Sequence, residues 1–173
     1  MLKDNVLNKL NEQLNYELAS AYVYFAMAGY LESINLKGFA NWMKVQAQEE
    51  IAHTARIFNY INDKSARVHM TALDAPKNDW SSPLAALEDA YAHECMISEK
   101  INECVTLAIK ENDHSTNTFL QWFVAEQVEE EAAADDIVQK LRLIGDNSSG
   151  LYLLDTELRN RSFDDVDGGS GGG

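Results

Sequence analysis

Apolar residues recur along this chain in alternating steps of three and four, the spacing that predicts amphipathic helices. Four long stretches show the pattern, at about residues 4–33, 35–63, 83–112 and 115–145. Each predicted helix has about 28 residues and is therefore about 42 Å long. Ser82 and Pro83 are typical of a helix start, and Gly145 is typical of a helix end.

The lengths of the connections predict how these helices are arranged. Short links join the first helix to the second and the third to the fourth, so each pair should be antiparallel. The link at 64–82 has about 18 residues and can span ~60 Å, enough to return along the whole bundle. We therefore predict an all-α four-helix bundle with one long crossover between helices 2 and 3.

A short C-terminal fifth helix is expected at 151–161, which would complete one domain at 1–161. Residues 162–173 end in Gly-Gly-Ser-Gly-Gly-Gly and are predicted to be a flexible tail, partly an artificial linker.

Polar residues interrupt the inward seam, the line of core-facing positions, near the middle of every long helix. They are Glu17 in the first helix, Glu50 and His53 in the second, Glu94 in the third, and Gln127 and Glu130 in the fourth. In an antiparallel bundle the middles of the helices meet at one level. An unpaired buried carboxylate costs several kcal/mol, and no lysine or arginine occupies a predicted seam. Two divalent ions bridged by Glu50 would balance the charge, although hydrogen-bonded polar residues also occur in cores for structural reasons.

Further acids lie beside the seam residues. Glu49, Glu126 and Glu129 are each one residue from a predicted ligand, and with Glu130 they predict a third metal position. The alternative is an ordinary solvated face, as charge runs usually are. Tyr24 lies one heptad after Glu17 and could either pack in the core or serve the site through redox chemistry or a hydrogen bond.

The ligand types and the composition narrow the chemistry. Carboxylates with one imidazole suit iron, whereas soft metals would require thiolates. Cys95 and Cys104 lie off the predicted seams, ~13 Å apart on one helix, so we expect ordinary helix residues without a disulfide. That cysteine usage favours a reducing cytoplasm. The net charge of −14 disfavours nucleic acid and anionic membranes as partners, and no apolar run approaches the ~18 residues of a membrane span.

Four stretches resemble the non-haem ferritins of bacteria and archaea, and the resemblance extends over about residues 1–161. They are Leu-Asn-Glu-Gln-Leu-Asn-Tyr-Glu at 10–17, Ala-Gln-Glu-Glu-Ile-Ala-His at 47–53, His-Glu at 93–94, and Phe-Leu-Gln-Trp-Phe-Val-Ala-Glu-Gln-Val-Glu-Glu-Glu at 119–131. The resemblance implies a ferritin-like fold and a homo-oligomeric shell of 24 subunits. It also implies a ferroxidase that oxidises ferrous iron with dioxygen or peroxide and stores ferric oxyhydroxide mineral.

The same resemblance implies roles for individual residues. The first iron would be held by Glu17, Glu50 and His53, and the second by Glu50, Glu94 and Glu130. Gln127 would lie close to the second iron. Tyr24 is a candidate catalytic residue on a separate ground, its place on the same stripe as Glu17. A third iron would be held by Glu49, Glu126, Glu129 and Glu130.

Three departures from related families refine this expectation. The second Glu-x-x-His of di-iron enzymes is here Gln127-x-x-Glu130, so the second site is all-oxygen, which favours exchangeable iron. Haem is not expected, because the position of the haem-ligating methionine of bacterioferritins falls near Ile51. Asn117 and Leu120 are neutral where animal ferritins line their three-fold pores with acids.

Three other functions remain open from the sequence. A non-storing di-iron oxidase or peroxidase of the rubrerythrin type would be a small oligomer, but the chain has no rubredoxin-like Cys-x-x-Cys. A DNA-protecting mini-ferritin fits this acidic chain poorly. A structural helical bundle without chemistry would bind no ferrous iron.

Overall fold

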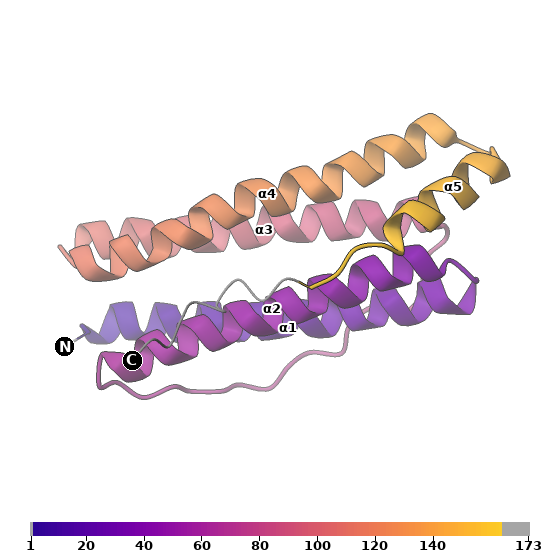
Figure 1. The fold of residues 1–173 in the computed structure, drawn as a ribbon. Helices are drawn as coiled ribbons and strands as arrows, with labels where there is room; N and C mark the ends of the chain where they lie inside the picture. The colour runs from indigo at the N-terminus through magenta and orange to yellow at the C-terminus, as the bar shows by residue number, and fades with distance from the viewer. Residues whose placement is uncertain (1, 164–173) are drawn as a thin grey trace, which may run out of the picture.

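The structure is a computed structural model that describes residues 2–163, which form five helices and no strand (Figure 1). The long helices are α1 (Asp4–Ser33), α2 (Lys37–Asp63), α3 (Pro83–Lys110) and α4 (His114–Ile144), and α5 (Ser148–Leu158) is short. One antiparallel pair, α1 and α2, faces a second pair, α3 and α4 (Figure 1). The predicted all-α bundle with one long crossover and a short fifth helix is confirmed. Most of the predicted tail, from residue 164 onward, lies outside the described residues.

Several helix ends differ from the predicted ones because local caps decide them. Helix α2 begins at Lys37 rather than 35, since Asn35 has a left-handed backbone with φ of 61°. Helix α5 begins three residues earlier than predicted, because the side chain of Asn147 accepts hydrogen bonds from the backbone N–H groups of Ser149 and Gly150. It also ends three residues earlier, at Leu158, so residue 161 lies beyond it.

Two asparagines of α1 hold the crossover along the bundle. The Asn11 side chain accepts from His69 N (2.7 Å) and donates to Arg67 O (3.3 Å). One turn later, the Asn15 side chain accepts from Thr71 N (2.8 Å) and donates to His69 O (2.9 Å). These bonds satisfy backbone groups of an irregular segment, which explains why so long a connection is ordered.

A carboxylate of helix α5 bonds to the start of α2. Asp155 Oδ1 accepts from the backbone N–H of Gly38 (2.7 Å) and of Phe39 (3.3 Å). Helix α2 has no side-chain cap of its own, so Asp155 supplies the missing acceptor from another helix. The approach requires a glycine, because a Cβ at position 38 would lie 1.6 Å from Asp155 O.

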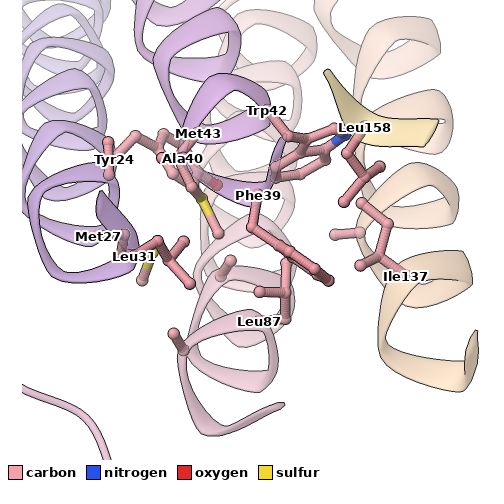
Figure 2. Close-up of a cluster of buried hydrophobic side chains, with 14 of the residues drawn as sticks. Tyr24, Met27, Leu31, Phe39, Ala40, Trp42, Met43, Leu87, Ile137 and Leu158 are labelled. Carbon is pink, nitrogen blue, oxygen red and sulfur yellow. The ribbon is translucent and has the colours of Figure 1, made fainter. Parts of the chain in front are cut away.

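The core consists of two apolar clusters at different levels of the bundle. The first contains Phe39, Leu87 and Ile137 (Figure 2), and the second contains Leu14 and Phe123. On each long helix, the metal-ligand candidates fall between the residues of the two clusters. One polar layer therefore lies between two apolar layers of the bundle. None of the helices that the structure describes is long and apolar enough to cross a membrane.

The predicted seam of α3 is wrong in part. Spacing in threes and fours from Glu94 places Ser98 and Val105 inward, but both are only half-buried, whereas Ile97 and Cys104 are buried in the core. The inward face is rotated by one residue there, and Cys104 is a core residue rather than one that lies off the seam. Glu94 is inward in both registers, so the polar layer is unaffected.

We expect Gly38→Ala to lower the melting temperature by several degrees, because the new Cβ would push α5 away from α2. Gly29→Ala is the matched control, since Gly29 is an exposed helical residue with nothing within 4 Å of the added Cβ. That change should leave the melting temperature equal or slightly higher, because alanine favours helix by about 1 kcal/mol. Equal melting temperatures for Gly38→Ala and the unmodified protein, measured by circular dichroism, would refute this account of docking.

Candidate metal centre

All four long helices bring polar side chains to one buried layer, as the sequence predicted. Each of these side chains belongs to a residue that is at most 5% exposed. They are Glu17 on α1, Glu50 and His53 on α2, Glu94 on α3, and Gln127 and Glu130 on α4. Burial of four carboxylates at one level makes the layer unfavourable unless protons or cations balance it.

Glu17, Glu50 and His53 form the tightest group. One ligand atom from each lies within 4.8 Å of the others. His53 Nδ1 is 3.5 Å from Glu50 Oε2 and 3.9 Å from Glu17 Oε2. These three atoms and Glu50 Oε1 are buried and have no hydrogen-bond partner among the described residues. Buried polar atoms that face one another without protein partners fit a bound metal ion.

Amide side chains fix the other carboxylates of the layer. Gln13 Nε2 donates to Glu17 Oε1 (2.8 Å), Gln46 Nε2 donates to Glu130 Oε2 (2.6 Å), and Gln127 Nε2 donates to Glu94 Oε2 (3.1 Å). Each of these bonds holds one oxygen of a carboxylate. Within the described residues no such amide reaches Glu50, so its two oxygens stay free to bridge.

Gln13 and Gln46 were not predicted as site residues. The available signal was spacing, because Gln13 precedes Glu17 by four residues and Gln46 precedes Glu50 by four, which places each pair on one helix face. Their effect is to orient carboxylates before a metal arrives.

Tyr24 packs in the core and also bonds to Glu94, so core packing and a hydrogen bond to a predicted ligand occur together. It is fully buried, and its hydroxyl donates a hydrogen bond to Glu94 Oε1. Burial, followed by the charge of Glu94, raises the pKa of Tyr24 well above its usual value. The hydroxyl therefore stays protonated and remains a donor.

The electrostatics of the metal-free layer favour uptake of protons in place of cations. Burial raises the pKa of Glu94 to about 7, with the nearby Glu130 adding to the shift. Burial also raises the pKa of Glu50 well above its usual value. Burial opposes charge on Glu17 and His53 as well, but their mutual contact outweighs it, so the pKa of Glu17 is lowered and that of His53 is raised. A divalent cation would displace these protons, and a set of oxygens with one imidazole nitrogen suits iron.

The acids predicted for a third position are only partly brought together. Glu126 and Glu130 join His53 in a second group whose ligand atoms lie within 4.8 Å of one another. Glu49 is outside this group and instead bonds to Arg161, and Glu129 is exposed and also outside it. The pKa of Glu49 is raised to about 7 by burial, against the opposing charge of Arg161.

Two aromatic rings pack against the side chain of His53. Trp122 and Phe123 contact the imidazole edge-on, with centroids 5.3 and 5.9 Å away. Trp122 is half-buried, and the Arg56 guanidinium lies 4.2 Å from its ring centre. These rings restrict the orientation of His53.

Glu94→Gln should flatten the pH dependence of the melting temperature of the metal-free protein. The folded state holds the Glu94 proton up to a pKa of about 7, whereas an unfolded glutamate releases it near 4.5. The stability that this proton contributes is therefore present below about pH 4.5 and is lost as the pH rises through about 7. The control is Glu99→Gln, an exposed position on the same helix. If both variants keep the wild-type slope between about pH 5 and pH 8, the Glu94 account is wrong.

Comparison with known proteins agrees with this geometry. The profile of the family described as "Ferritin-like domain" matches residues 7–144. Two curated relatives are the bacterial non-heme ferritins of Staphylococcus aureus (strain MRSA252), 41% identical, and Staphylococcus saprophyticus, 42% identical. Each alignment spans 165 residues, or 95% of this chain and 99% of the relative.

Solved structures show the same likeness. An engineered closed form of the Archaeoglobus fulgidus ferritin is 48% identical, with a TM-score of 0.94 over 95% of this chain and 100% of the other. The open-pore ferritin of the same hyperthermophilic archaeon is also 48% identical, with a TM-score of 0.93 over 94% and 100% of the two chains. With a family profile over most of its length and close relatives along nearly all of it, this chain belongs to the ferritin family.

Proposed function

We propose that this protein is an iron-storage ferritin that oxidises Fe(II) to Fe(III) at a di-iron centre within each subunit. The ferric iron would be stored as oxyhydroxide mineral inside a shell of 24 copies. The observation that carries the proposal is the buried layer, in which unpaired atoms of Glu17, Glu50 and His53 face one another without a compensating lysine or arginine among the described layer residues.

The two iron ions are the substrate, and the available ligand atoms support a position for each. Glu17 and His53 would hold the first ion, and Glu94 and Glu130 the second, with Glu50 shared between them. Glu50 suits the bridging role because both of its oxygens are unpaired, whereas the oxygens of Glu94 are already engaged by Tyr24 and Gln127.

The chemistry that follows needs little from the side chains beyond placement. Two ferrous ions each lose one electron, and dioxygen accepts both electrons with two protons to give hydrogen peroxide. The carboxylates balance the charge of the ions, and the buried layer keeps the ions at a fixed separation. Tyr24 and the three glutamines maintain the carboxylate orientations while iron enters and leaves.

Release of iron is favoured by the all-oxygen character of the second position. Glu130 stands where a second histidine would strengthen binding, and its Oε2 is shared with Gln46. The acids at Glu126 and Glu129 lead from the buried layer toward the exposed face of α4. We propose that iron oxidised in the layer leaves through this third position.

Replacement of His53 tests the proposal. We expect His53→Ala to slow the fast phase of ferrous oxidation at least about tenfold, because it removes the one imidazole ligand among the described residues of the layer. His114→Ala is the control, since His114 lies at the start of α4, far along the helix from the layer. Stopped-flow absorbance of ferric products in air provides the rates. Equal fast phases for both variants would contradict the assignment of the site.

Size-exclusion chromatography of the same samples separates storage from the rubrerythrin-type alternative. A particle of about 24 subunits that retains iron far beyond a few ions per chain supports storage. A small oligomer that retains only the ions of its sites would instead indicate a non-storing oxidase or peroxidase. A helical bundle without chemistry would show neither oxidation nor retained iron.

A further inference from the structure

The carboxylate of Glu49 forms an ion pair with Arg161, a residue near the C-terminal end of the chain. Arg161 lies just beyond α5 and donates from Nη2 to Glu49 Oε2 at 2.7 Å. The side chains of both residues are about one-fifth exposed, with values of 23% for Arg161 and 20% for Glu49. Such partial burial protects the ion pair from much of the screening that weakens surface pairs.

The segment that carries Arg161 is anchored along α2 by two further contacts. The Arg161 guanidinium lies 4.7 Å from the centre of the Trp42 ring, and Asn41 Nδ2 donates to Arg161 O at 2.9 Å. Asn41 and Trp42 precede Glu49 by about two helical turns, and Figure 1 shows the chain after α5 crossing onto α2. Arg161 is therefore held beside Glu49 by contacts that do not involve the pair itself.

The hydrogen bond between the two side chains is single rather than a paired fork. Arg161 Nη1 is buried and has no hydrogen-bond partner among residues 2–163. A guanidinium that used both nitrogens on one carboxylate would be held more firmly. With only one hydrogen bond to Glu49, Arg161 can be displaced by a cation that binds the carboxylate more tightly.

Glu49 stands apart from the other acids, and its carboxylate bonds to Arg161 instead. Glu126, Glu130 and His53 present ligand atoms within 4.8 Å of one another, but the carboxylate of Glu49 does not join them. A divalent ion bound by that group would repel the guanidinium and attract the same carboxylate. The two cations therefore compete for Glu49.

We propose that Arg161 is a positioning residue that holds Glu49 away from the third iron position, and that an ion bound there takes Glu49 from Arg161. This inference rests on the proposed function, because it takes iron as the ion that reaches Glu126 and Glu130. Such coupling is reciprocal. Iron bound at the third position weakens the Arg161–Glu49 ion pair, and the ion pair lowers the affinity of the third position for iron by the same factor. The third position would thus fill after the two positions of the buried layer.

The reactivity of Arg161 toward p-hydroxyphenylglyoxal, a small arginine reagent, tests the proposal. The protein is labelled without iron and after anaerobic loading with ferrous ion, and peptide mass spectrometry gives the rate at each arginine. We expect iron to speed labelling of Arg161 about fivefold, as loss of a partly buried ion pair would allow. Arg159 and Arg142 pair with Asp155 and Glu88, so they serve as references within the same chain and should not change.

Three variants make the readout specific. Glu49→Gln should make Arg161 react fast with or without iron, because its partner carboxylate is gone. Glu126→Gln keeps that partner but weakens the third position, so Arg161 should stay slow even with iron. Glu88→Gln should speed labelling of Arg142 alone, which establishes that the reagent reports loss of an ion pair.

The count of bound ferrous ions, measured in the same samples, separates the possible failures. If two ions bind per chain and the Arg161 rate does not rise, or if no further ion depends on Glu49, the inference is wrong while the proposed function stands. If no ferrous ion binds at all, the proposed function fails and the inference fails with it.

Discussion

The rest of this structure depends on the negative charge buried at one level of the bundle. Four carboxylates from four helices meet where the described layer contains only one basic side chain, His53. Hydrogen bonds from amides and from Tyr24 orient three of these carboxylates but cannot neutralise them. Burial drives the layer toward protonation, as the raised pKa values of Glu50 and Glu94 indicate. The layer is thus poised to exchange protons for cations.

The architecture maintains that unfavourable layer by burying apolar residues on both sides of it. Phe39, Leu87 and Ile137 pack at one level, and Leu14 and Phe123 at the other. Long, continuous helices are needed because each must pass through all three levels. The crossover held by Asn11 and Asn15 then allows the second helix pair to close over the first.

Much of the fold and of the central group of ligands could be predicted from the sequence, because both follow from helical spacing. The period of three and four places Glu17, Glu50 and Glu130 inward, and the connection lengths place their helices. Spacing was ambiguous on α3, where the rows with Ser98 and Ile97 are both plausible seams, and the structure chooses Ile97. The roles of individual ligands are proposals, supported by the burial of these side chains and by the way their ligand atoms face one another.

Other features depend on contacts between distant segments, which spacing does not encode. The bond of Arg161 to Glu49 joins residues separated by 112 positions, and Glu49 lies outside the group that His53, Glu126 and Glu130 form. The cap that Asp155 provides for α2 is of the same kind. In both cases the C-terminal part of the chain supplies a hydrogen-bond partner to α2: an acceptor for its first backbone N–H groups and a donor for the Glu49 carboxylate.

The central claim is that two cations occupy the buried layer and share Glu50. Crystals grown with ferrous iron under anaerobic conditions, with anomalous diffraction recorded at the iron edge, test it most directly. We predict two iron peaks between the four long helices, one beside Glu17 and His53 and one beside Glu94 and Glu130, with Glu50 touching both. A fully loaded crystal without iron in this layer, or with iron only among the exposed acids, would contradict the account.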